Sequence, residues 1–396
     1  MMQISPEIQL FIREHSSDDV RVLALQAKKY PDIDMPTAIT QIAGRKVAAE
    51  KIPSWWEIEK IWYPKHLSLE QCSSEITARY KARLLQGDSL TDLTGGFGID
   101  CSFLATGFKS ATYVERQEEL CEIAAHNFPV LNLNHINIKN EDGVTYLQVM
   151  SPVDSLFLDP ARRNEHGGKT VAISDCEPNV AELEELLLQK ANRVMIKLSP
   201  MLDLSLALKE LKQTQEVHIL SVNNECKELL ILLGQTSPAE ISIHCVNLFT
   251  KGTQKEQHFV FTREQEQCSE CTYTDSLETY LYEPNASLLK AGAFRSIAAA
   301  YPVRKLHPNS HLYTSDTFIE NFPGRIFRIV NQCSFNKKEV KENLADLKKA
   351  NVTVRNFPAT VAELRKRIHL AEGGDTYLFA STLNNGQKVL IRCEKV

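Results

Sequence analysis

The sequence lacks several features that would mark whole classes of protein. No stretch approaches the roughly 18 consecutive apolar residues that a membrane-spanning helix needs. The first residues, Met1–Pro6, have neither the basic region nor the apolar run of a secretory signal. There is no internal repeat and no low-complexity run. We therefore expect a protein that resides in the cytoplasm and does not enter a membrane.

Cysteine has no pattern that would indicate a disulfide framework or a zinc site. The ten cysteines are scattered through 396 residues, which favours buried thiols. Cys268 and Cys271 are separated by two residues, but no second such pair follows, and only His258 or Cys245 could serve as remote partners. We therefore predict no metal site.

The composition is that of a globular protein, with 43% hydrophobic and 24% charged residues. The length suggests two or three structural units. The net charge of −5 is unevenly distributed. From Leu281 to the end there are 18 Lys and Arg against 10 Asp and Glu, a net charge of +8, whereas residues 1–280 hold 27 against 40, a net charge of −13. The last third of the chain is therefore basic.

The first part of the chain, residues 1–86, is predicted to be a helical domain. Apolar residues recur at spacings of three and four in Val20–Lys29, Pro36–Lys51 and Glu70–Leu85. All three tryptophans, Trp55, Trp56 and Trp62, fall in one short segment. Packing between helices is the favoured interpretation, and a surface that lines a substrate channel is the alternative.

From Ser89 onward, short apolar strands alternate with helices, which is typical of a parallel sheet covered on both faces. The last two strands are separated by only five residues, which include Asn223-Asn224. So short a connection predicts an antiparallel hairpin. We expect an α/β fold with a Rossmann-like, seven-stranded sheet in residues 87–262. The predicted strands are Ser89–Leu93, Ala111–Glu115, Ile136–Ile138, Ser155–Asp159, Arg193–Leu198, Val217–Val222 and Glu228–Gly234.

The remaining chain, residues 275–396, is predicted to form an α+β domain. Strand-like segments at Ile241–Phe249 and His258–Thr262 precede it, and the polar stretch Arg263–Asp275 is interpreted as a linker. The predicted helices are Ala286–Ala300, Lys337–Lys349 and Thr360–Ile368, and the predicted strands are Arg325–Val330, Val352–Asn356, Thr376–Thr382 and Val389–Arg392.

A glycine-rich turn follows the first strand and opens a helix. Its glycines permit a tight bend and a close approach of a ligand to the backbone. Cys101 stands where a dinucleotide fingerprint has its third glycine. Asp92 would repel a pyrophosphate but suits the ammonium and sulfonium charges of S-adenosylmethionine. We expect this cofactor to bind at Asp92, Thr94, Gly95, Gly96, Phe97 and Gly98.

Two further acidic positions follow the second and third strands. Glu115, with Arg116 next to it, ends the second strand, where a carboxylate can accept hydrogen bonds from both hydroxyls of a ribose. Asp142 and Gly143 follow the third strand. Asp142 is interpreted as a helix N-cap, as a cofactor contact, or as both. We expect Glu115, Arg116, Asp142 and Gly143 to belong to the cofactor site.

The fourth strand closes with Asp159-Pro160, at the edge where open α/β sheets place their chemistry. Our hypothesis is that Asp159 orients or deprotonates the substrate nucleophile, while Arg162 and Arg163 either bind phosphate or form structural ion pairs. Lys197 ends the fifth strand on the same edge, either within reach of a substrate or as a solvated lysine. The predicted catalytic residues are Asp159, Pro160, Arg162 and Lys197.

These motifs carry a family resemblance. The sequence resembles class I S-adenosylmethionine-dependent methyltransferases with a C-terminal THUMP-like domain, a family assigned to RNA methylation. The resemblance implies that Asp142 and the backbone N–H that follows it hold the adenine. It also implies that a proline carbonyl after Asp159 accepts a hydrogen bond, although Ala161 and Arg162 replace the family's second proline and aromatic residue and leave the target atom open. The residues that carry it are Asp92–Asp100, Glu115, Asp142, Asp159–Arg163, Tyr282-Glu283-Pro284-Asn285-Ala286 and Arg355-Asn356-Phe357-Pro358.

THUMP domains are associated with tRNA, so the resemblance implies a base in structured RNA, tRNA or rRNA, as the substrate. The basic clusters support this, because phosphate neutralisation favours binding, although each could instead be a solvated helix face. The alternatives are a methyltransferase for a small molecule or a protein, and a noncatalytic RNA-binding protein with a degenerate methyltransferase domain. The sequence does not define an oligomeric state. The clusters are Arg304-Lys305, Lys337-Lys338, Lys348-Lys349, Arg355 and Arg365-Lys366-Arg367.

Overall fold

The computed structural model describes residues 4–162, 172–236 and 238–396. The chain divides into two compact units. Unit 1 comprises Met1–Gln215 and Leu229–Pro238, and unit 2 comprises Glu216–Glu228 and Ala239–Val396. No helix within these described ranges has the length and apolar character to cross a membrane.

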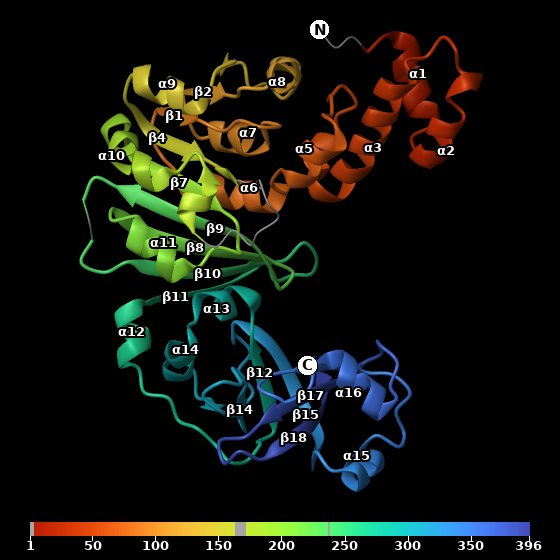
Figure 1. The fold of residues 1–396 in the computed structure, drawn as a ribbon, viewed down its shortest axis with the longest axis vertical. Helices are drawn as coiled ribbons and strands as arrows, with labels where there is room; N and C mark the ends of the chain where they lie inside the picture. The colour runs from red at the N-terminus through yellow and green to blue at the C-terminus, as the bar shows by residue number, and fades with distance from the viewer. Residues whose placement is uncertain (1–3, 163–171, 237) are drawn as a thin grey trace. The chain divides into compact units, whose positions relative to one another are not determined.

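The chain begins with a helical lobe that contains the predicted amphipathic helices (Figure 1). Its core is formed by Ile8, Phe11, Leu23, Met35 and Ile42. The lobe is followed by a short helix around Trp55 and by two more helices. The bounds are α1 Pro6–Glu14, α2 Val20–Leu25, α3 Met35–Lys51, α4 Pro53–Trp56, α5 His66–Gln71 and α6 Glu75–Ala82.

One predicted helix in this region is divided in the structure. The segment Glu70–Leu85 was expected to be continuous, but α5 ends at Gln71 and α6 begins only after Ser74. Ser74 and Cys72 have extended backbone conformations, with ψ values of 155° and 160°. This break matters because it positions Ser73, which is buried at the sheet edge described below.

The tryptophan segment is largely packed against other parts of the chain, as the core interpretation expects. Trp55 is buried and meets the ring of Phe97 edge to face, with centroids 5.2 Å apart. Trp62 stacks on His126 at 3.7 Å. Trp56 is the exposed member of the three and lies beside the guanidinium group of Arg45.

The central sheet contains the seven predicted strands in the order β3-β2-β1-β4-β7-β9-β8, and β10 and β11 extend it at one edge. The strands from β3 to β7 are parallel, and β9 runs antiparallel to β7, as the short asparagine turn predicted. Asn223 and Asn224 adopt positive φ values in that turn. The bounds are β1 Ser89–Asp92, β2 Ser110–Val114, β3 Ile136–Lys139, β4 Val153–Leu158, β7 Ala191–Leu198, β8 Thr214–Val222, β9 Glu225–Gly234, β10 Ser242–Leu248 and β11 Glu256–Thr262.

Helices α7 to α11 connect the strands and pack around them (Figure 1). Apolar strand residues of this sheet, such as Leu156, Val194 and Ile231, are fully buried. This alternation produces the α/β class that the sequence predicted. The remaining bounds are α7 Ile99–Ala105, α8 Glu118–Val130, α9 Gly143–Val149, α10 Val180–Lys190, α11 Leu204–Glu210, and a two-stranded ribbon of β5 Ala161–Arg162 and β6 Cys176–Glu177.

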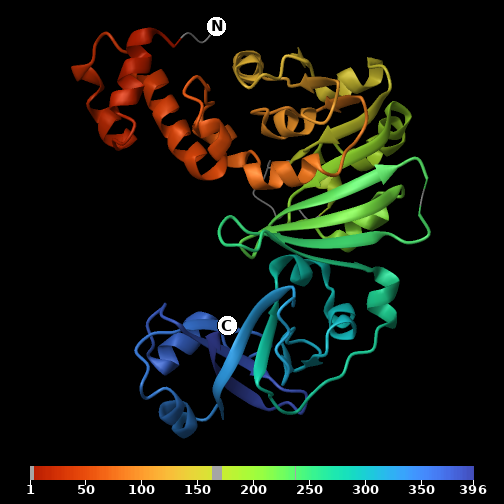
Figure 2. The same ribbon diagram turned by 180° about the vertical axis from the view of Figure 1, so that it is seen from behind.

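The C-terminal part of unit 2 is built on a second sheet, in the order β13-β14-β12-β15-β18-β17-β16 (Figure 2). Its longest strand, β15, pairs with β12 on one side and with β18 on the other, both antiparallel. The strands are β12 Tyr280–Pro284, β13 Arg304–Lys305, β14 Tyr313–Ser315, β15 Gly324–Ser334, β16 Asn351–Val354, β17 Thr376–Thr382 and β18 Lys388–Lys395.

Two details of this part differ from the prediction. The polar stretch interpreted as a linker contains α12, Arg263–Cys268, because Thr262 and Gln265 form a capping box at its start. The predicted helix Ala286–Ala300 is interrupted at Gly292, which adopts a left-handed conformation with φ 77°. The helices are α13 Ala286–Ala291, α14 Phe294–Ala300, α15 Lys337–Asn343 and α16 Val361–Ile368.

Candidate active site at the carboxyl edge of the sheet

The glycine turn is fixed by hydrogen bonds to the strands on both sides. Asp92 Oδ1 accepts from the Thr94 N–H at 2.9 Å, and the Gly95 N–H donates to the Val114 carbonyl at 2.8 Å. Gly96 and Gly98 have φ values of 53° and 86°, a region that favours glycine. The backbone therefore makes a tight left-handed bend before α7 begins.

Glu115 closes this bend from the neighbouring strand. Its two carboxylate oxygens accept hydrogen bonds from the N–H groups of Gly96, at 2.9 Å, and Gln117, at 2.8 Å. The residue as a whole is only 8% exposed. Arg116 points elsewhere, since its guanidinium group is 3.7 Å from Glu177 and its side chain is 65% exposed. The structure thus joins Glu115, but not the Arg116 side chain, to the glycine turn.

The turn after β3 packs directly against the residue that follows β1. Asp142 caps α9, because its Oδ1 accepts from the N–H groups of Val144 and Thr145, each at 3.0 Å. Gly143 lies so close to the Leu93 carbonyl oxygen that a Cβ atom would overlap with it. Asp142 therefore acts as the helix cap that the sequence predicted, and the residue is exposed at the same edge of the sheet.

Replacing Gly143 with alanine is expected to destabilise the protein by about 1–3 kcal/mol, because the new methyl group must displace backbone. Gly107→Ala is the matched control, since its added methyl group would meet the nearest atom at an ordinary 3.7 Å. Urea unfolding of both variants measures the difference. Equal midpoints for the two variants would contradict the close packing of the two turns.

Asp159 and Lys197 meet at the carboxyl ends of adjacent strands. Asp159 follows β4, and its N–H donates to Thr94 Oγ1 at 2.6 Å. Lys197 lies in β7, and its Nζ is 2.5 Å from Asp159 Oδ2. Side-chain exposure is 38% for Asp159 and 9% for Lys197, so a substrate can reach the carboxylate more easily than the ammonium group. Lys197 is therefore a buried partner of Asp159, and the solvated interpretation is wrong.

Behind this pair lies a buried ionic network that sequence reasoning missed. Asp100, in α7, is 2.8 Å from the Nζ of Lys81 and 3.3 Å from the Nζ of Lys197. Ser73 donates to Asp100 at 2.7 Å and contacts both lysines. Lys81 comes from α6 and is completely buried. No spacing pattern connects these residues, because the helices bring them together only in the folded chain.

Burial and the two lysines of the network shift the pKa values of three carboxyl groups at this edge. Burial would raise the pKa of Asp100, but Lys81 and Lys197 outweigh it and lower the pKa to about 2. Burial raises the pKa of Asp159 above its ordinary value, against the opposing effect of Lys197. Burial also raises the pKa of Asp92 to about 8, and its Oδ2 has no hydrogen-bond partner among the described residues. Three carboxyl groups of different basicity thus lie at one edge of the sheet.

The other predicted catalytic positions are only partly described. Pro160 is buried immediately after Asp159. The backbone of Arg162 belongs to β5 and pairs with Cys176, but its side chain and all of Arg163 lie outside the described residues. Cys176 is buried in β6, at 2% exposure, which disfavours a nucleophilic role for its thiol.

Comparison with known proteins identifies the family. A crystal structure from Porphyromonas gingivalis W83, designated a "putative methyltransferase", shares 35% sequence identity with a TM-score of 0.87, and the match covers 98% of each chain. A ferredoxin-like domain family matches residues 280–323, and a THUMP domain-like family matches residues 324–395. The chain belongs to the class I methyltransferases with a C-terminal THUMP-like domain.

Other solved structures match a smaller part of the chain of this methyltransferase. An rRNA methylase from Streptococcus thermophilus shares 15% identity with a TM-score of 0.30, covering 40% of this chain and 93% of its own. A Streptococcus mutans structure designated a "putative methyltransferase" in complex with SAH shares 14% identity with a TM-score of 0.30, covering 40% and 96%. No curated protein matches the sequence.

The C-terminal motifs of this methyltransferase have structural roles. Glu283 is 1% exposed and accepts hydrogen bonds from both Arg325 and Arg355. Asn285 caps α13 by accepting from the N–H groups of Ser287 and Leu288. Arg355, which the sequence suggested for RNA contact, thus shares the single carboxylate of Glu283 with Arg325, and its side chain is 37% exposed.

Proposed function

We propose that this methyltransferase uses S-adenosylmethionine and modifies a base in structured RNA. The observation that carries the proposal is the juxtaposition of the glycine turn, closed by Glu115, with the Asp159–Lys197 pair. A cofactor held at the first would lie beside a proton acceptor at the second. The match of residues 324–395 to a THUMP-like domain supports RNA as the substrate class.

The residues at the turn fit this cofactor in charge and in shape. Oδ2 of Asp92 is buried and unpartnered among the described residues, and an ammonium group would satisfy it. A Cβ built on Gly96 has no atom nearer than 3.8 Å, so the backbone there is open to a ligand. Asp92 and the glycine turn would hold the charged end of the cofactor, Glu115 the ribose, and Asp142 with Gly143 the adenine.

The bound cofactor supplies an electrophilic methyl group on a sulfonium. In the chemistry that we propose, Asp159 orients the substrate nucleophile and accepts its proton. Lys197 fixes the Asp159 carboxylate through Oδ2, and Asp100 in turn fixes Lys197. A raised pKa makes Asp159 a stronger base than an ordinary aspartate. Pro160, locked in φ and buried, holds the turn in which Asp159 lies.

Cofactor affinity is expected to rise with pH up to about 8, by as much as tenfold per pH unit. In the free protein the pKa of Asp92 is about 8, so the carboxyl group is largely protonated below that pH. A cationic ligand favours the carboxylate, and binding must therefore release a proton. Calorimetry with S-adenosylmethionine in buffers of different ionisation enthalpy measures this proton.

The matched variant is Asp92→Asn, which cannot ionise. It should bind more weakly at pH 8 and lose both the pH dependence and the proton release. Absence of any binding to S-adenosylmethionine or its demethylated product by the unmodified protein would overturn the proposed cofactor. Binding without proton release would overturn only the role of Asp92.

The surface available for RNA lies on α15, α16 and the loop after α15. Seven cationic side chains there are exposed, and no ion pair is found for them within the described parts of the chain, whereas Arg365 on α16 lies 3.9 Å from Glu372. By contrast, Arg304 pairs with Glu278, and Lys305 is buried against the Pro308 carbonyl. The exposed cations are Lys337, Lys338, Lys341, Lys348, Lys349, Lys366 and Arg367.

Removing two of these cations, in Lys366→Ala/Arg367→Ala, is expected to weaken binding to bulk tRNA and to reduce the slope of log affinity against log salt by about 1–2. The pair Lys28→Ala/Lys29→Ala, exposed on the N-terminal lobe, is the charge-matched control and should bind normally. Filter binding over a salt series with tRNA and with rRNA tests this. Complete indifference to both RNAs would favour a small-molecule or protein substrate.

A further inference from the structure

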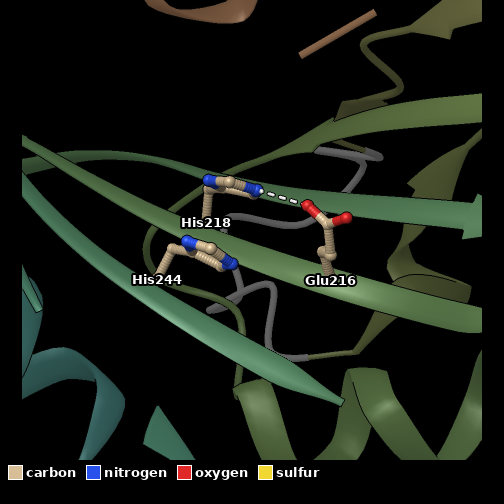
Figure 3. Close-up of side chains that lie close together, drawn as sticks. All are labelled: Glu216, His218 and His244. Atoms are coloured by element: carbon tan, nitrogen blue, oxygen red, sulfur yellow. Dashed lines mark hydrogen bonds and ion pairs between the residues drawn. The ribbon is translucent and has the colours of Figure 1, made fainter. Parts of the chain in front are cut away.

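A second cluster of reactive side chains lies in unit 2, on β8 and β10. These strands are parallel, with His218 opposite His244 and Glu216 opposite Ser242. Glu216 and His218 are two residues apart on one strand, so their side chains share a face of the sheet. Figure 3 shows the carboxylate of Glu216 on the side to which a ring nitrogen of each histidine points.

The potential ligand atoms of the three residues are close together. One atom from each lies within 4.8 Å of the other two, and His218 Nε2 is 3.2 Å from Glu216 Oε2. The two imidazole rings are stacked, with centroids 4.3 Å apart and an interplanar angle of 14°. Two nitrogen atoms and one oxygen atom that can bind a metal therefore lie close together beside the strands.

A fourth residue orients one of these rings. His244 Nδ1 is 3.1 Å from His258 Nε2, which comes from β11. This contact occupies Nδ1 and leaves Nε2, near Ser242 at 3.3 Å, on the side of Glu216. In metal-binding histidines, a contact at the second ring nitrogen fixes the tautomer and the ring direction.

Burial favours a site that is held by protein but open on one side. His218 is 2% exposed, and the side chain of Glu216 is 30% exposed. The stacked rings must tilt toward each other to share one ion, and His244, which is only half-buried, can supply that movement. Solvent reaches the three residues on the side of Glu216. A water molecule could therefore serve as a further ligand.

We propose that Glu216, His218 and His244 bind one divalent transition-metal ion, with Zn²⁺ as the best match. Imidazole nitrogen with a single carboxylate suits Zn²⁺ and Fe²⁺ and disfavours Mg²⁺ and Ca²⁺, which prefer oxygen. Three protein ligands leave a coordination position for water. The site is independent of the proposed cofactor and RNA, since none of its residues belongs to the turn or to the basic helices. It also departs from the sequence prediction of no metal, which had considered Cys268 and Cys271.

The test uses the full-length, tag-free protein after treatment with a chelator. Calorimetry and elemental analysis should give one Zn²⁺ per chain, and Zn²⁺ should raise the melting temperature. Glu216→Gln and His244→Gln should each weaken Zn²⁺ binding more than tenfold, and His258→Gln by about tenfold through loss of ring orientation. Cys268→Ala/Cys271→Ala is the control and should bind Zn²⁺ as the unmodified protein does.

Co²⁺ substitution adds a spectroscopic test, because thiolate ligands give an intense near-ultraviolet band that nitrogen and oxygen ligands lack. The spectrum should contain no thiolate band, and Fe²⁺ should compete for the same single site. Undiminished Zn²⁺ binding in Glu216→Gln and His244→Gln, or loss of binding in the cysteine variant, would overturn the proposal. So would the absence of any ion bound by the unmodified protein.

Discussion

Replacing Lys81 with methionine is expected to reduce the free energy of unfolding by about 3–5 kcal/mol. Methionine preserves most of the volume of the lysine, so the loss comes from charge and not from a cavity. Asp100 would keep a buried carboxylate with one of its two cations missing. Urea unfolding at neutral pH measures the difference.

The double variant Lys81→Met/Asp100→Asn tests that explanation, because it removes the unpaired charge as well as its partner. It should be more stable than Lys81→Met alone, whereas equal or lower stability would contradict the ionic account. Lys109→Met is the surface control. Its ion pair with Asp88 has a similar distance of 2.8 Å but is exposed, so little change is expected.

The same network predicts how the free energy of unfolding changes at acidic pH. The folded pKa of Asp100 is about 2, below its unfolded value of about 3.9. Its contribution is therefore complete above pH 4 and is lost as the pH falls toward 2. In Lys81→Met the pKa of Asp100 in the folded protein rises, so the contribution of Asp100 to stability should be smaller. The difference in the free energy of unfolding between the variant and the unmodified protein should therefore become smaller below pH 4.

Asp159→Asn is expected to lower the rate of methyl transfer by about 10²–10⁴-fold while changing cofactor affinity little. Asparagine retains the shape of the side chain but cannot accept the substrate proton. Single-turnover transfer of labelled methyl to RNA isolated from cells that lack the protein measures the rate, and calorimetry measures cofactor binding.

The matched control for this substitution is Asp88→Asn, at the amino end of the same sheet and largely exposed. It should leave methyl transfer unchanged. Equal losses of rate and of cofactor affinity in Asp159→Asn would contradict the assigned role and would place Asp159 in the cofactor site instead.

Local signals were sufficient to predict the central sheet. The seven strands are short apolar runs bounded by polar turns, and Asn223-Asn224 marks the hairpin that reverses the last strand. The edge at which Asp92, Glu115 and Asp159 lie follows from the rule that parallel strands present their carboxyl ends together. Whether these residues bind the cofactor and substrate as expected stays a prediction.

The partners of these residues could not be predicted, because they depend on packing between distant segments. Ser73 and Lys197 are 124 positions apart, yet their side chains are 3.1 Å from each other. The count of charges in the sequence likewise could not show ion pairs, such as the one that Arg355 forms with Glu283. The proximity of the histidines on β8 and β10 could not be predicted either. It depends on the register of the two strands, which places His218 opposite His244.

The position of Lys81 also decides what the smallest working fragment of this enzyme is. A piece excised to begin at Ser89 would keep every strand of the central sheet and all the proposed contacts to cofactor. It would nevertheless lack Ser73 and Lys81, and the remaining lysine would be divided between Asp100 and Asp159. We therefore expect a catalytically competent truncation to start upstream of Ser73 and to keep α6, which carries Lys81.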